Sequence, residues 1–448
     1  MRAFPFDTGL TIATVGLLLA GLRLVAPAVQ GPETAHFAAI VDFSSPHTAL
    51  SPLRPHSEPE AALVSKIAIL GEPLLLDDSA GVLDHFYEAL WRTEKREDGA
   101  VTRILHYGDS PTTADLITGD VRIALQQRFG DAGHGFILVA KPWAWYQHTG
   151  AEVSGSGWQI TPASHFVTHD GMFGLGGVSF IGSVAAASRM AFAHGGYTRF
   201  EAWYLQQPGG GEFSLSAGGR ALGRVDTASD FKSPGFAAFQ TASAAPALEI
   251  RVERGNVRLF GITAEGPGPG VVYDSLGLNG ASIRILSRMY NEAHWAEELQ
   301  HRNPALAIVN YGTNEADFAE FVDRQYEKEL REALRRIHAA LPDASVLVMS
   351  PMDRGRRSGP GGIETMPTIP QIVEIQRRVA RETGCGFFDT YAAMGGEGTM
   401  ARWYAERPRL VSADLIHPNP AAGKMIAGIF TREIERGLNR FKLRHSGQ

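Results

Sequence analysis

The apolar positions along this chain follow two different periods. In the C-terminal half, short apolar runs alternate with stretches of helical spacing. The runs span 305–311, 345–350 and 386–389, and the helical stretches span 326–341, 372–383 and 420–438. The same alternation begins earlier, with an amphipathic helix from Leu83, a short strand over 103–107 and a helix over 114–129. Nearly continuous apolar strands alternating with helices predict a parallel sheet that is covered on both faces.

Residues 142–270 have a different pattern. Apolar and polar residues alternate over 200–204 and 248–252, and Gly-rich segments separate such stretches. Alternation with a period of two predicts half-buried strands. We therefore expect an antiparallel, sandwich-like β domain inserted between two parts of an α/β domain, 76–141 and 271–448.

The N-terminus has the features of a targeting segment. Residues 10–22 are almost entirely apolar, Arg2 precedes them, and Ala26-Pro27-Ala28 follows them with a small-x-small pattern. This predicts that 1–30 form a signal peptide cleaved near Ala28. The alternative is an uncleaved anchor over 10–29 that associates with a membrane, although Arg23 interrupts it. Residues 31–75, rich in Pro, Ser, His and Glu, are predicted to be a linker.

Composition excludes some classes of function and cofactor. The chain carries 42 Lys and Arg against 48 Asp and Glu, and no basic cluster indicates a nucleic-acid partner. The single cysteine, Cys385, cannot form an intramolecular disulfide and is expected to be a small buried residue. His165 and His169 are four residues apart but have no third ligand nearby, so we expect neither a metal nor another cofactor.

Candidate chemistry lies in short polar motifs at strand ends or before a helix. In chain order they are Gly108-Asp109-Ser110, the LGLNGAS segment at 276–282, Tyr311-Gly312-Thr313-Asn314-Glu315, and Asp414-Leu415-Ile416-His417-Pro418. Ligands of open α/β sheets bind at the carboxyl ends of the strands, so the first and third motifs should face one crevice.

These motifs, in this order, resemble those of the SGNH (GDSL-type) hydrolases. The resemblance covers roughly 80–140 and 270–440, and it implies a flavodoxin-like three-layer α/β fold with a parallel sheet. It implies Ser110 as nucleophile, with Asp414 and His417 completing a triad. It further implies an oxyanion hole formed by the backbone N–H of Ser110, by Gly280 and by Asn314.

The residue types suit that chemistry. A serine hydroxyl needs a base to become a nucleophile, and a histidine such as His417 is the side chain most often used as that base. Asp414 would hold the imidazole in the required tautomer. Taken singly, Ser110 could instead cap a helix, Asn314 could be a turn residue, and Asp414 and His417 could form a helix-entry cap. Two departures from the common family pattern are Glu315, where many members have Asp, and Pro111 directly after the nucleophile.

A narrower resemblance concerns bacterial peptidoglycan O-acetylesterases. It rests on 106–110, Arg122, 129–133 and 135–136. Those enzymes are exported and carry a β-sandwich insert similar to carbohydrate-binding modules. The resemblance implies an O-acetylated glycan as substrate. It also implies a location in the periplasm, or at the inner membrane facing the periplasm.

Other residues and functions remain open from the sequence. Trp143, Trp145 and Tyr146 could stack on sugar rings or pack a domain interface. Asp353 follows the run that ends at Ser350 and is expected to line the crevice. The same acyl-enzyme would serve a polysaccharide O-acetyltransferase, and the fold also supports lipases and thioesterases. A carbohydrate-binding envelope protein with a silent site is the alternative from another class. The sequence does not indicate an oligomeric state.

Overall fold

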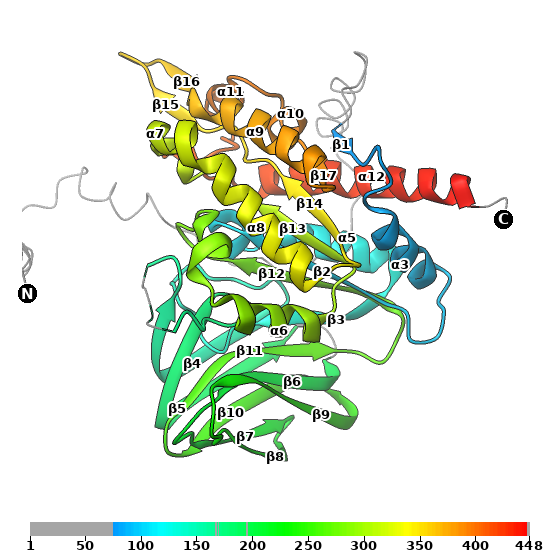
Figure 1. Ribbon diagram of the computed structural model, residues 1–448, viewed down its shortest axis with the longest axis vertical. Helices are drawn as coiled ribbons and strands as arrows, with labels where there is room; N and C mark the ends of the chain where they lie inside the picture. Colours follow the sequence, from blue (N-terminus) through cyan, green and yellow to red (C-terminus); the bar gives the residue numbers. More distant parts are fainter. Residues whose placement is uncertain (1–74, 166–167, 169, 194–195, 446–448) are drawn as a thin grey trace, which may run out of the picture. The chain divides into compact units, whose positions relative to one another are not determined.

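The computed structural model describes residues 75–165, 168, 170–193 and 196–445 (Figure 1). All of them belong to one of two compact units, Pro55–Gln448. The predicted signal or anchor segment 1–30 and the linker, except for its last residue, lie outside the described residues. Within the described ranges, no helix is long and apolar enough to cross a membrane.

The α/β part is built on a parallel sheet. Five of its strands, each parallel to its neighbours in this set, are in spatial order β12 (Gly270–Gly277), β2 (Val101–Gly108), β13 (Leu306–Asn310), β14 (Ser345–Met349) and β17 (Gly386–Phe388). Ranked along the chain, this order reads 2-1-3-4-5, which is the flavodoxin-like arrangement. The short β1 (Leu76–Asp77) pairs antiparallel with β17. The α/β fold predicted from the sequence is confirmed.

Helices cover both faces of this sheet (Figure 1). On one face lie α3 (Asp84–Glu94), α5 (Thr118–Phe129) and α12 (Pro420–His445), and on the other α6 (Glu292–Arg302), α8 (Glu327–Ala340) and α9 (Thr368–Glu382). Successive strand residues point to opposite faces. Accordingly Ile104 is buried in the core with α5 and α12, and Leu105 in the core with α6, α8 and α9. This explains why the strands read as continuous apolar runs.

Shorter elements connect these layers at the carboxyl ends of the strands. They are α4 (Ser110–Thr113), the π-helical turns Ile285–Met289 and Val322–Tyr326, the 3₁₀ turn Glu315–Asp317, α7 (Ala319–Phe321), β15 (Gly355–Arg357), β16 (Ile363–Thr365), α10 (Thr390–Ala393) and α11 (Thr399–Ala405). The helix predicted over 114–129 begins later, at Thr118, and a separate short helix, α4, precedes it. Asp115 has a φ of 54°, which separates α4 from α5. The buried Asp115 carboxylate accepts bonds from Thr118 and Arg122, and these hold the break in place.

The region predicted as an insert is antiparallel, as expected. Its strands are β4 (Ala151–Pro162), β5 (Val178–Phe192), β6 (Tyr197–Gln206), β7 (Glu212–Ala217), β8 (Arg220–Asp226), β9 (Ser233–Ala245), β10 (Ala247–Arg254) and β11 (Val257–Glu265). The start of β11 pairs with β5 and its remainder with β6, so this strand links two packed layers. Trp203 is fully buried against Phe136 and Phe236.

This β region is hydrogen-bonded to the parallel sheet through β3 (Asp131–Ile137). That strand runs antiparallel to β11 and parallel to β12. A buried ion network adds to the link, because Arg302 on α6 binds both Asp274 on β12 and Glu265 on β11. The ladder of strands therefore does not stop at 142 or 270, and the domain boundaries proposed there remain predictions.

Candidate active site

The candidate nucleophile lies on a tight turn after β2. Asp109 precedes α4, and Ser110 is its first residue. A Cβ atom on Gly108 would lie 2.2 Å from Thr112 Oγ1, and one on Gly277 would lie 2.1 Å from the backbone nitrogen of Thr113. A side chain at Gly277 would collide with backbone atoms, and one at Gly108 would displace the Thr112 side chain. The chain thus turns closely against β12 and leaves Ser110 partly exposed above the strand ends.

Ser110, His417 and Asp414 form a continuous hydrogen-bonded chain. Ser110 Oγ lies 2.7 Å from His417 Nε2, and His417 Nδ1 lies 2.7 Å from Asp414 Oδ2. An ionised carboxylate can only accept, so Nδ1–H donates to Asp414 and Nε2 is left to accept the serine proton. Ser110 and His417 are 307 positions apart in the sequence, and the fold brings them together.

The loop between Asp414 and His417 fixes the carboxylate. Its Oδ1 accepts from the backbone N–H groups of Ile416 and His417, at 2.9 and 3.1 Å. Leu415 adopts a left-handed φ of 64° within this turn. Burial raises the pKa of Asp414, but the hydrogen bonds from His417 and Ile416 outweigh it and hold the pKa below its ordinary value. Asp414 is therefore charged at neutral pH.

The predicted oxyanion residues flank Ser110 by strand register. Gly277 and Asn310 both pair with Gly108, one on each neighbouring strand. Gly280 and Asn314 follow these positions within four residues. Gly280 has a φ of +68°, a conformation that glycine adopts readily. Asn314 Nδ2 donates one bond to the carbonyl of Ala281 at 2.8 Å, which joins the two loops.

Glu315 holds the same two loops together. It is 2% exposed, and its Oε1 accepts from Ile283 N at 2.7 Å while its Oε2 accepts from Gly312 N at 3.1 Å. Burial raises the pKa of Glu315 to about 7, against the hydrogen bond from Ile283, and the nearby Asp109 adds to the rise. The sequence showed Glu315 only as a departure from the family pattern, and its burial was not visible there.

Asp109 is a second buried carboxyl beside the nucleophile. It is 3% exposed, and burial raises its pKa to about 6. A hydrogen bond with Thr313 and the charges of His417 and Arg354 act in the opposite direction. Arg354 also donates to the carbonyl of Thr313 at 2.6 Å, so this segment supports the loop that carries Asn314.

Two of the candidate substrate contacts are corrected by the structure. Tyr146 is 3% exposed, and its hydroxyl accepts from Leu138 N at 3.2 Å, so its ring packs in the core. Asp353 is 1% exposed, and its carboxylate accepts from Met400 N at 2.8 Å, in the first turn of α11. Aromatic and polar residues near a crevice either contact the substrate or pack inside the wall of the crevice, and the sequence does not distinguish these two roles.

The other aromatic candidates are half-buried. The ring centroid of Trp143 lies 6.1 Å from that of His165. His165 in turn lies close to Gly280, because its Cε1 would be 3.8 Å from a Cβ atom added to that glycine. This pair therefore borders the loop that carries Gly280, and sequence reasoning missed it because His165 was considered only with His169 as a metal ligand. His169 lies outside the described residues. Contacts of Trp143 and Trp145 with sugar remain predictions.

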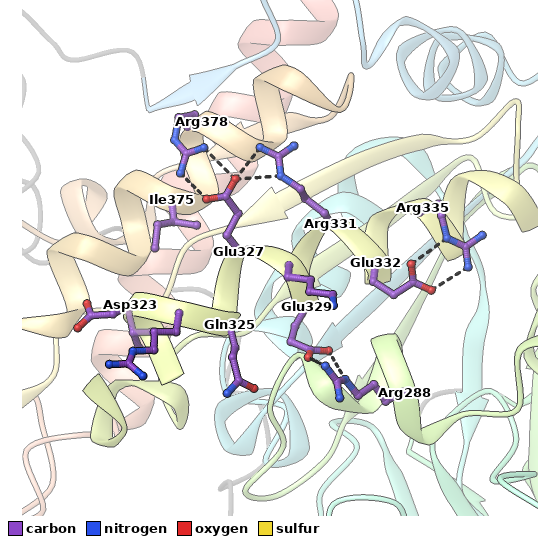
Figure 2. Close-up of a pocket in the computed structure, with 13 residues that line it drawn as sticks. Arg288, Asp323, Gln325, Glu327, Glu329, Arg331, Glu332, Arg335, Ile375 and Arg378 are labelled. Carbon is purple, nitrogen blue, oxygen red and sulfur yellow. Dashed lines mark hydrogen bonds and ion pairs between the residues drawn. The ribbon is translucent and has the colours of Figure 1, made fainter. Parts of the chain in front are cut away.

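A charged hollow of about 1000 Å³ lies elsewhere, along α8 and α9 (Figure 2). Its walls are occupied by ion pairs, such as Glu327 with Arg331 and Arg378 and Glu329 with Arg288. None of the triad residues lines it.

In the described parts of the chain, no group of three or more His, Cys, Asp or Glu side chains is arranged to hold a metal ion. Cys385 is buried, as expected, and burial raises its pKa to about 11.

Comparisons with known proteins found one family model and several solved structures that are similar to this chain. A model of the GDSL-like lipase/acylhydrolase family matches residues 252–424, a range that contains Gly280, Asn314, Asp414 and His417 but begins after Ser110. A solved structure described as "Peptidoglycan O-acetylesterase in action, 5 min" is 23% identical, with a TM-score of 0.68, over 80% of this chain and 96% of that chain. At this identity the likeness shows a shared fold.

Further solved structures are more distant. A family two carbohydrate esterase from Clostridium thermocellum in complex with cellohexaose is 11% identical, with a TM-score of 0.28, over 63% of this chain and 99% of that chain. A putative GDSL-like lipase from Parabacteroides merdae is 17% identical, with a TM-score of 0.29, over 38% and 74%. The comparison with curated proteins found no significant match. The family model thus matches residues 252–424 of this chain, and the fold is shared with the solved structure described as a peptidoglycan O-acetylesterase.

Proposed function

We propose that this protein is a serine esterase that removes O-acetyl groups from carbohydrate, with peptidoglycan as the favoured substrate, through an acetyl-Ser110 intermediate. The observation that carries the proposal is the unbroken chain from Ser110 Oγ through the His417 ring to the Asp414 carboxylate, with 2.7 Å at each junction. Helix capping would not require this chain. A base oriented by a carboxylate and within reach of a hydroxyl is the arrangement that activates serine.

The first half-reaction moves acetyl onto the enzyme. Ser110 Oγ attacks the acetyl carbonyl carbon as its proton passes to His417 Nε2, and Asp414 stabilises the resulting imidazolium. The oxyanion accepts from the N–H groups of Ser110 and Gly280 and from the Asn314 amide. The carbon–oxygen bond to the sugar then breaks, and the His417 Nε2 proton goes to the departing sugar oxygen. The sugar leaves with a free hydroxyl.

The second half-reaction uses water. His417 Nε2 takes a proton from a water molecule, whose oxygen attacks the acetyl carbonyl. The ester bond to Ser110 breaks, Ser110 recovers its proton from His417, and acetate leaves. Transfer to a second sugar would replace this water with a sugar hydroxyl, so a product assay distinguishes esterase from O-acetyltransferase.

Carbohydrate is favoured by two features in addition to the triad. The motifs around 106–136 resemble those of peptidoglycan O-acetylesterases, and the similar solved structure bears that description. The half-buried Trp143 borders the loop that carries Gly280, where an aromatic face can stack on a sugar ring. Export is proposed as well, from the apolar stretch at 10–22, which would bring the enzyme to the periplasm, either free or anchored.

The test is acetate release from nitrophenyl acetate and from O-acetylated peptidoglycan. Wild-type protein should release acetate from both, and Ser110→Ala should release it from neither. Ser156→Ala, at an exposed position on β4, is the matched control and should keep full activity. Release from the small ester alone would keep the esterase and reject the wall glycan. Equal release by wild type and Ser110→Ala would reject the proposed nucleophile.

A further inference from the structure

Exposed arginines gather around one tyrosine near the catalytic loop. Arg357 is the last residue of β15, and Arg407 and Arg409 follow α11. The guanidinium carbon of Arg409 lies 4.2 Å from the centroid of the Tyr404 ring, and that of Arg357 lies 5.8 Å from it. All three arginines are exposed and Tyr404 is half-buried. We call these four residues the Tyr404 patch.

The positive charge of this patch is not neutralised by ion pairs. The neighbouring Arg356 pairs with Glu364 at 2.7 Å, but in the part of the chain that the structure describes none of the patch arginines has an acidic partner within 4.0 Å. Arg407 instead donates to backbone carbonyls at the end of α11. Glu406, also exposed, lies next to it in sequence. A hydrogen bond from Arg357, then the charges of Arg409 and Arg407, lower the pKa of Tyr404. The local potential is therefore positive.

The patch is attached to the loop that carries His417. The backbone N–H of Gly355, the first residue of β15, donates to the carbonyl of Leu415 at 2.9 Å. On the other side, Val411 bridges to Pro418, directly beside His417, and Arg409 lies two residues before Val411. The hairpin β15–β16 and α11 lie side by side (Figure 1). The patch therefore adjoins the loop that holds His417 beside Ser110.

We propose that the Tyr404 patch is a subsite for the carboxylate groups of an acidic polysaccharide whose acetyl ester lies at Ser110. Guanidinium groups bind carboxylates with paired hydrogen bonds, and an aromatic ring between them offers a face for a sugar. The inference rests on the proposed esterase function and deepens it, because it names the class of glycan. Neutral glycans would gain no ion pair from the patch, and only the contact with the Tyr404 ring.

The binding test uses the full chain with Ser110→Ala and two polymers, polygalacturonate and neutral dextran. Polygalacturonate should bind more tightly than dextran, and only its binding should weaken as sodium chloride is raised. Each exposed ion pair contributes about 1.4- to 5-fold to affinity, so Arg357→Gln with Arg409→Gln should weaken binding about 2- to 25-fold. Replacing both by Lys keeps the positive charge but removes the paired hydrogen bonds, so it should weaken binding by less than the Gln replacements do. Arg220→Gln, at an exposed position on β8, is the distant control.

Activity separates this inference from the proposed function. With Ser110 intact, the double Gln variant should match wild type on nitrophenyl acetate and lose kcat/KM on acetylated polygalacturonate by the factor lost in binding. Equal binding of polygalacturonate and dextran, or a double Gln variant that behaves like Arg220→Gln, would overturn the subsite. Failure of the esterase function would appear instead as no acetate release by wild type, and the binding comparison would stand apart from it.

Discussion

Glu315 offers a direct test of how the two loops that carry Gly280 and Asn314 are positioned. Its two carboxylate oxygens accept from Ile283 N and Gly312 N, one in each loop that flanks Ser110. Glu315→Gln keeps the size of the side chain but turns one acceptor into a donor. One buried N–H would then lack a partner, at a cost of about 1–3 kcal/mol. If this cost falls on the transition state, kcat should decrease roughly 5- to 150-fold.

The assay is kcat and KM on nitrophenyl acetate, with circular dichroism to verify folding. We expect the loss in kcat, with KM nearly unchanged, because the loops serve the oxyanion rather than the ground state. Glu320→Gln is the matched control, since Glu320 lies nearby on α7 with its side chain 78% exposed. A folded Glu315→Gln variant with the kcat of wild type would refute the reasoning.

The remaining predictions concern the triad, the core and pH. Asp414→Asn should lower kcat about 10²- to 10⁴-fold by removing the acceptor for the imidazole N–H, with KM little changed, as measured by steady-state kinetics. Arg302→Ala leaves the buried carboxylate of Asp274 without its ion-pair partner, whereas Glu265 keeps Arg103, and the loss should destabilise the fold by about 3–5 kcal/mol in urea unfolding. Gly277→Ala, whose Cβ would lie 2.1 Å from the backbone nitrogen of Thr113, should abolish acetate release, whereas Gly268→Ala, with open space around it, should not. The pKa of Glu315 is about 7 in the folded protein and about 4.5 in the unfolded chain, so between these pH values the folded protein binds more protons. The free energy of unfolding of wild type should therefore fall as pH rises from 4.5 to 7. The fall should be less steep in Glu315→Gln, as measured by urea unfolding at several pH values.

The sequence predicted the parallel sheet well because its strands and its helices have different patterns of apolar residues. Buried strands such as 305–311 have no polar face, and helices such as 326–341 show a clear apolar stripe. The break at Asp115 was missed because its cause is tertiary: the carboxylate accepts bonds from Arg122 and Thr118 inside the fold. The continuity of β3 with both β11 and β12 was missed for the same reason, since strand pairing over long separations leaves no local signal.

For the candidate site, short motifs were sufficient to bring out Ser110, Asp414 and His417, because each motif follows or precedes a predictable element. The surrounding residues were harder to interpret. Tyr146 and Asp353 have the chemistry of contacts but are buried, and burial depends on packing that a single sequence does not display. Glu315 was visible only as an unusual letter in a motif, and its role follows from two backbone N–H groups that the fold brings to it.

The central claim is that Ser110 carries the acetyl group, and the most direct measurement is the mass of the enzyme during turnover. Wild-type protein mixed with nitrophenyl acetate and quenched in acid within the first turnovers should gain the mass of one acetyl group. Peptide mapping should place that group on the segment with Ser110, and Ser110→Ala should gain none. An acetyl group on another residue, or acetate release by Ser110→Ala at the wild-type rate, would contradict the account.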